Sequence, residues 1–172
     1  MAFIKHAFAL VPLATLAACF PYFTSYVHLQ AQEVTLVAAT CGNNAGPPVF
    51  ARYERNGARF DVTLEPGLAA RTQNGFIKVR APANVTVAIP DAAGYVGLEN
   101  GDPPIRFRLK LAQTANLAGT VEQRFDFEGL PAKIDFGGTL HLPDVIVDGK
   151  TVVAPVFEFY RQRYAGVVPA NC

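Results

Sequence analysis

The chain has few of the side chains that most enzymes use for catalysis. Its 172 residues include one serine (Ser25), three histidines and no tryptophan. A serine hydrolase needs its nucleophile held rigidly beside a histidine base, and Ser25 lies in an N-terminal segment ahead of the expected folded domain. Cysteine catalysis would require Cys41 or Cys172 to stay reduced. These absences argue against nucleophilic catalysis.

Motifs for metals, phosphates and dinucleotides are absent as well. The sequence contains no H-E-x-x-H, no C-x-x-C and no glycine-rich phosphate loop, so we expect no cofactor and no metal. Glu99–Asp102 gathers oxygen ligands in one loop, which fits either calcium binding or ordinary turn chemistry. His141 lies in a strand pattern, and an exposed or edge-strand histidine is its simplest interpretation.

The first 18 residues have the pattern of a signal peptide. Lys5 supplies a positive charge, and an apolar run follows from Ala7 to Ala18. The run ends in Leu16-Ala17-Ala18-Cys19. This motif resembles the lipobox of bacterial envelope lipoproteins. The resemblance implies cleavage before Cys19, followed by lipidation of its thiol and its freed amine.

The same resemblance bears on localisation. In such lipoproteins an aspartate after the cysteine favours retention in the inner membrane, and this chain has Phe20 there. The resemblance therefore implies a protein that is anchored by its lipid in the outer membrane and faces the periplasm. Residues 19–32 would form a lipidated tether. Two alternatives remain open. No Asp, Glu, Lys or Arg occurs from Ala7 to Gln32, a length that would also suit an uncleaved helical anchor, and a signal peptidase could instead cut after Ala31.

The number of cysteines predicts a disulfide in the mature chain, and the net charge limits its classes of partner. Lipidation of Cys19 would leave Cys41 and Cys172 as a pair, and an oxidising compartment then predicts a disulfide between the two ends of the domain. Without Lys5 the chain has 14 basic and 14 acidic residues. This neutrality argues against a nucleic-acid partner, which would need a basic surface.

Strand signals follow one another from Val34 to the C-terminus. Asn56-Gly57 and Asp148-Gly149 each separate two β-rich runs and predict two-residue hairpins, and Gly137-Gly138 suggests a bulge or a bend. We therefore expect residues 33–172 to form a single all-β domain. Its expected architecture is an antiparallel β-sandwich, immunoglobulin-like or related, with a closed β-barrel as the alternative.

Two strands are expected to carry opposite charges on their exposed faces. Apolar residues alternate with Arg106, Arg108 and Lys110 in one strand, and with acidic residues including Asp126 and Glu128 in a later one. Pairing of the two strands would give cross-strand ion pairs. The cationic row is a candidate site for an anionic partner, and a plain solvent-facing strand is its alternative.

Taken together, these features favour a non-catalytic, membrane-tethered module that binds an unidentified envelope or toxin protein. An immunity protein against a periplasmic toxin and an accessory subunit of an envelope assembly are two concrete versions. A glycan-acting enzyme is an alternative that would need two carboxylates about 5–10 Å apart in a cleft. A barrel-type carrier of a small apolar ligand is another.

Overall fold

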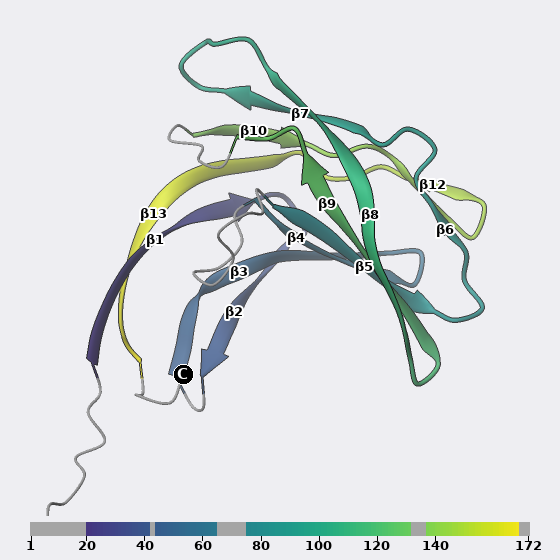
Figure 1. The fold of residues 1–172 in the computed structure, drawn as a ribbon, viewed down its shortest axis with the longest axis horizontal. Helices are drawn as coiled ribbons and strands as arrows, with labels where there is room; N and C mark the ends of the chain where they lie inside the picture. The colour runs from purple at the N-terminus through teal and green to yellow at the C-terminus, as the bar shows by residue number, and fades with distance from the viewer. Residues whose placement is uncertain (1–19, 42–43, 65–74, 132–136, 169–172) are drawn as a thin grey trace, which may run out of the picture.

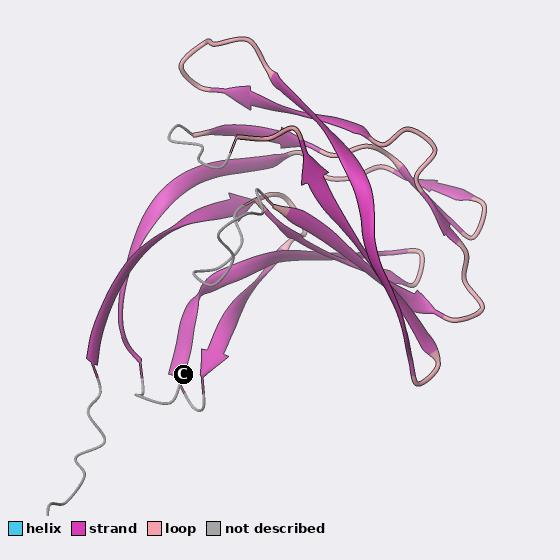
Figure 2. Ribbon diagram, viewed as in Figure 1, coloured by secondary structure: helices cyan, strands magenta, loops and turns pink. Residues whose placement is uncertain are grey.

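The structure is a computed structural model that describes residues 20–41, 44–64, 75–131 and 137–168. These residues form strands, turns and loops, with no helix among them (Figures 1 and 2). The strands are β1 (Phe20–Gln30), β2 (Thr35–Cys41), β3 (Asn44–Arg55), β4 (Ala58–Thr63), β5 (Phe76–Pro82), β6 (Val87–Ala88), β7 (Ala93–Leu98), β8 (Ile105–Leu117), β9 (Thr120–Glu128), β10 (Gly138–His141), β11 (Val145–Val147), β12 (Lys150–Val152) and β13 (Phe157–Val168).

One large antiparallel sheet dominates the molecule. Its ten strands run in the order β1-β13-β10-β7-β8-β9-β5-β4-β3-β2, and a separate three-stranded sheet has the order β12-β11-β6. The large sheet curls until β3 also contacts β1 and β13, which gives a nearly closed, barrel-like shape (Figure 1). The predicted all-β antiparallel class is confirmed, and the barrel alternative describes the shape of this sheet.

Both predicted hairpins are confirmed. Asn56 and Gly57, between β3 and β4, have φ angles of 51° and 76°, and Asp148 and Gly149, between β11 and β12, have 50° and 73°. A two-residue turn with positive φ at both central positions matches the right-handed twist of its flanking strands. Asparagine, aspartate and glycine tolerate that conformation at little cost.

At Gly137-Gly138 the sequence suggests a bulge or a bend, but the pairing of β10 with β7 and β13 shows no register shift, and Gly138 instead lies close to a neighbouring backbone. Gly138 opens β10 and pairs with Leu98 of β7. A Cβ atom on Gly138 would overlap the carbonyl of Gly97. The residue therefore has no side chain because the neighbouring strand occupies that space.

The segment expected to be a tether contains the first strand instead. Residues 20–30 form β1, which pairs with β13 along its full length, from Phe20 opposite Val168 to Gln30 opposite Glu158. Aromatic and β-branched residues favour a strand there, and Leu29 is buried in the core. The folded domain thus includes residues 20–30, ahead of the expected boundary at residue 33, and a continuous helical anchor over Ala7–Gln32 is incompatible with this strand. The described residues include no helix with the length and apolar character needed to cross a membrane.

The core lies between the two halves of the curled sheet. Phe60 of β4 and Phe157 and Phe159 of β13 are almost completely buried. The Tyr53 ring stacks on Phe60 with a centroid distance of 4.6 Å and lies 6.1 Å from the ring of Phe157. Strands β3 and β4 therefore pack face to face against β13. The smaller sheet adds Val145, Val147 and Val152 to the same core.

Candidate interaction surface

The outer side of the large sheet carries two different surfaces. Strands β3, β4, β5, β9 and β8 present an ion-pair lattice, and strands β1, β13, β10 and β7 present a surface of tyrosine and histidine. Successive side chains of a strand point to opposite faces of the sheet. The residues of both surfaces alternate with the buried residues along each strand, so they point away from the core. The lattice consists of Arg52–Asp61, Arg59–Glu54, Lys78–Glu122, Arg80–Glu122, Arg124–Asp126 and Lys110–Glu128.

Cross-strand register creates all of the lattice pairs except Arg124–Asp126, which lies within β9. Arg52 of β3 lies opposite Asp61 of β4, and its Nε and Nη2 atoms donate to the two carboxylate oxygens at 2.6 and 2.8 Å. On β8, the Lys110 Nζ atom lies 2.9 Å from Glu128 Oε1 of β9. The expected pairing of the basic strand with the acidic strand is therefore confirmed.

Glu122 is the most strongly engaged carboxylate of the lattice. Burial alone would raise its pKa, but hydrogen bonds from Arg80 and Lys78, together with their positive charges, outweigh burial and lower it. Lys78, Glu122 and Arg124 also line a small open hollow with Gln113 and Ala115. A carboxyl group that acts as a general acid needs a raised pKa, so the environment of Glu122 favours a structural role.

The other candidate carboxylates are engaged in a similar way. Asp126 accepts a hydrogen bond from Arg124 Nε at 2.8 Å, and Glu128 binds Lys110. In the loop after β7, the Asn100 side chain accepts from the Asp102 amide at 3.1 Å, which is an ordinary turn interaction. No cluster of three histidine, cysteine or acidic side chains suited to a metal occurs in the described ranges.

The second surface, which we call the Tyr–His face, consists of Tyr26, His28, Tyr95, His141 and Tyr160. Tyr95 of β7 pairs with His141 of β10, and their rings stack at 4.1 Å with 12° between the planes. His28 of β1 pairs with Tyr160 of β13 and stacks on it at 4.8 Å and 27°. Tyr95 and Tyr160 nevertheless keep 42% and 41% of their surface exposed. Flat aromatic rings are thus held in place and open to solvent.

Neighbouring hydrogen bonds fix several of these rings. The His141 Nε2 atom lies 3.1 Å from the Thr139 hydroxyl, and the Tyr26 hydroxyl donates to Gln162 at 2.9 Å. Partial burial lowers the pKa of both His28 and His141. Both imidazoles are therefore neutral at neutral pH, which keeps the Tyr–His face without positive charge of its own.

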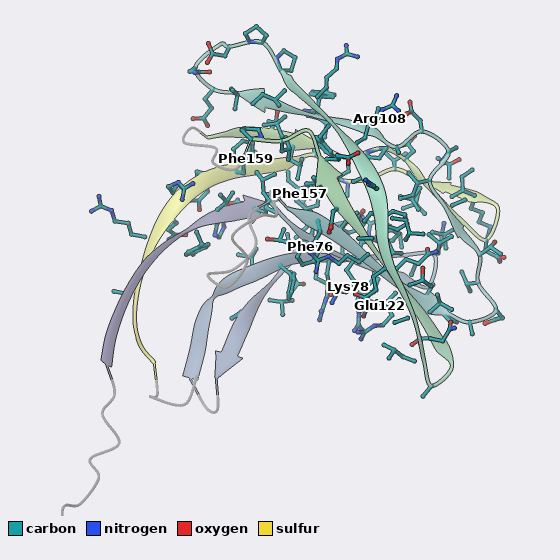
Figure 3. The ribbon with its side chains drawn as sticks, viewed as in Figure 1. Phe76, Lys78, Arg108, Glu122, Phe157 and Phe159 are labelled. Carbon is teal, nitrogen blue, oxygen red and sulfur yellow. The ribbon has the colours of Figure 1, made fainter. Side chains whose placement is uncertain are left out.

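Two arginines border the Tyr–His face. Arg106 of β8 lies opposite Tyr95, which in turn lies opposite His141, so the three residues form one row across β8, β7 and β10. Arg106 and Arg108 are exposed, and neither has an ion-pair partner in the part of the chain that the structure describes. Arg108 projects away from Lys78 and Glu122 of the lattice (Figure 3). The third member of the predicted cationic row, Lys110, is bound to Glu128.

The structure thus divides the predicted cationic row between the two surfaces of the sheet. Arg106 and Arg108 adjoin the Tyr–His face, whereas Lys110 belongs to the lattice. Cys19 and Cys172 lie outside the described residues, and Cys41 is the last residue of β2. The Cys41–Cys172 bridge therefore stays a prediction. Sequence reasoning missed the tyrosines because only strand register brings Tyr95 beside His141, and Tyr160 beside His28.

Comparisons of the chain with protein-family models, with curated proteins and with solved structures found no match. The two surfaces of the sheet and the N-terminal motif are therefore the features that bear on function.

Proposed function

We propose that the protein is a lipid-anchored envelope protein that acts as a non-catalytic protein-binding module, with the Tyr–His face as its binding surface. Arg106 and Arg108 extend that surface and select a partner with acidic side chains beside an apolar patch. An immunity protein that blocks a periplasmic toxin and an accessory subunit of an envelope assembly both fit this activity.

One observation carries the proposal: the exposed Tyr95 ring stacks on His141 and lies opposite Arg106. Arg106 and Arg108 have no ion-pair partner among the described residues. Tyrosine and arginine are enriched where protein interfaces gain most of their energy, whereas lysine and glutamate are depleted there. Tyr95 and Tyr160 expose large ring areas, and their stacking on histidine means that little side-chain freedom is lost on binding. The charges of the lattice, in contrast, already neutralise one another.

A carrier of a small apolar ligand is a second candidate, because one core group is not satisfied. Tyr53 is 2% exposed, and its hydroxyl lacks a hydrogen-bond partner among the described residues. A polar ligand atom near Tyr53 would satisfy it. The surrounding side chains are fully buried aromatic and aliphatic groups, however, and this packing favours the external surface over the interior.

Site-specific photocrosslinking in cells tests the binding proposal. A photoreactive phenylalanine analogue replaces Tyr95 in one strain and Lys150, an exposed residue of β12, in a control strain. We expect a discrete crosslinked protein at position 95 and none at 150. Adding Arg106→Glu should reduce the yield at position 95, because it opposes an acidic partner. Equal labelling at the two positions would count against the Tyr–His face as a binding surface.

Fatty-acid labelling tests the anchor separately. The natural chain should incorporate a labelled acyl chain, and Cys19→Ala should remain unprocessed and unlabelled. Because several acyl chains hold a protein stably at a bilayer, the natural chain should also sediment with membranes at high salt. Undiminished labelling of Cys19→Ala would remove the lipoprotein part of the proposal.

A further inference from the structure

We propose that one end of the large sheet lies against the surface of an anionic phospholipid bilayer. This end, the uncharged end, comprises residues 20–25, 37–41, 44–50 and 164–168. The inference rests on the proposed anchor, and it adds the part of the domain that the anchor brings into contact with lipid.

The anchor leaves no spacer before the fold. Strand β1 begins at Phe20, the residue after Cys19, and Phe20 is already paired with Val168 of β13. A lipid on Cys19 would therefore hold the beginning of β1 and the end of β13 at the level of the lipid headgroups. A long flexible tether, which would let the domain stand clear of the bilayer, is not present between the two.

Four strand termini meet at this end of the molecule. Figure 1 shows the beginnings of β1 and β3 and the ends of β2 and β13 on one side, away from β12. Strand β3 contacts both β1 and β13. None of the residues in the uncharged end is Asp, Glu, Lys or Arg, and the sequence from Val34 to Ala51 also contains none.

The two edge strands of the large sheet lack the charged residues that usually guard a sheet edge. β1 and β2 are the two outermost strands of the ten-stranded sheet. Soluble proteins usually protect such edges with charged residues, and lysine in particular, yet neither β1 nor β2 carries a formal charge. The sequence of this end also contains Tyr22 and Tyr164, and tyrosine concentrates at membrane–water interfaces. An open sheet edge cannot enter the hydrocarbon layer without unsatisfied backbone groups, so contact is confined to the headgroup region.

Arginines mark the limit of the uncharged end. Moving along β13 from its C-terminal end, the first charged residue is Arg163, opposite Ser25, and the next is Arg161, opposite Val27. Arg163 is exposed. Arg163 is thus an exposed basic residue just outside the uncharged end, where it would be attracted to anionic headgroups, which is why we specify an anionic bilayer.

The absence of tryptophan from the chain provides a direct test by fluorescence. The processed protein is reconstituted in phosphatidylethanolamine–phosphatidylglycerol vesicles as a Tyr22→Trp, a Phe23→Trp or a Val153→Trp variant. Positions 22 and 23 are adjacent in β1 and sample both faces of the strand, and Val153 is a control that is 70% exposed. We expect emission at position 22 or 23 to shift to shorter wavelength and to be quenched by lipids brominated near the headgroup. Emission at position 153 should not change.

Two arginine variants add specificity. Arg163→Glu should reduce the quenching at positions 22 and 23, and Arg106→Glu, also at an exposed arginine, should leave it unchanged. Unchanged emission at both 22 and 23 in correctly folded, reconstituted protein would overturn the inference, as would equal effects of the two arginine variants. Absence of acyl labelling in the natural chain would instead contradict the anchor. Absence of crosslinking at position 95 would contradict the binding surface, so the three failures are distinguishable.

Discussion

The rings of Tyr95 and His141 lie nearly parallel, 4.1 Å apart, on neighbouring strands. This pair links the stability of the sheet to its outer surface, because the histidine that supports the exposed tyrosine can gain a proton when the pH falls. His28 and Tyr160 repeat the arrangement on β1 and β13.

We predict that the protein loses stability as the pH falls. Burial lowers the pKa of His28 and His141 in the folded state, so the unfolded chain binds more protons. The histidine contribution is then fully present above the unfolded pKa of about 6.5 and decreases as pH falls below it. Denaturant unfolding between pH 7.5 and 5.5 measures this decline. The double variant His28→Phe/His141→Phe, which keeps both aromatic positions, should flatten it, and an unchanged slope would contradict the prediction.

Removal of the Glu122 charge should destabilise the lattice. Glu122→Gln leaves Lys78 and Arg80 side by side without their shared carboxylate, and we expect a loss of about 1 kcal/mol in the free energy of unfolding. Glu128→Gln is the matched control, because Glu128 is 60% exposed and binds only an exposed lysine, so its loss should be close to zero. High salt should shrink the difference. Equal losses in the two variants would indicate that the greater burial of Glu122 does not strengthen its ion pairs.

Tyr53→Phe should stabilise the protein. The substitution removes a buried hydroxyl for which the described part of the chain offers no partner, and it keeps the ring stacked on Phe60. We expect a gain of about 1 kcal/mol, measured by chemical denaturation. Tyr26→Phe is the control, because the Tyr26 hydroxyl bonds to Gln162 and its removal should give no gain. A loss of stability in Tyr53→Phe would show that its hydroxyl is satisfied in solution, which would favour the carrier function.

Gly138→Ala should be strongly destabilising. The added methyl group would overlap the backbone of Gly97, and separating β10 from β7 would also disturb the Tyr95–His141 stack. We expect a loss of at least about 2 kcal/mol in thermal or denaturant unfolding. Val153→Ala, at an exposed position, should change stability little. A neutral Gly138→Ala variant would mean that the two strands can separate at low cost.

The predicted Cys41–Cys172 bridge can be tested chemically. After blocking of free thiols, peptide mapping without reductant should recover the two cysteines in one linked fragment. Cys41→Ser/Cys172→Ser should then lower stability by up to about 5 kcal/mol, since the bridge closes a long loop. Recovery of both cysteines as blocked free thiols would show that the disulfide does not form.

Local sequence signals predicted much of the fold. The Asn56-Gly57 and Asp148-Gly149 turns depend on residues that tolerate positive φ, and such signals do not require tertiary context. Alternation in Ile105–Leu111 likewise identified an exposed cationic face. β1 was missed because a charge-free run of strand-forming residues after a signal peptide resembles an anchor or tether, and only its pairing with β13 distinguishes them.

The candidate surface was less predictable for a similar reason. Arg106 and Lys110 occupy equivalent positions in one alternating strand, but a partner strand neutralises Lys110 and leaves Arg106 beside Tyr95. Sequence periodicity specifies which face a residue occupies, and only register specifies its cross-strand neighbour. Tyr95 and His141 are 46 positions apart in the chain, and no local pattern joins them.

The full-length pairing of β1 with β13 also has a mechanical consequence. If the chain is held at Cys19 and a bound partner pulls on the domain, tension enters along β1 from its first residue. Backbone hydrogen bonds in an antiparallel ladder lie perpendicular to the strands, so a pull along the strand loads the whole β1–β13 ladder in shear. Rupture would then require many bonds to yield together. Strand β1 would thus transmit force from such an anchor to the body of the protein.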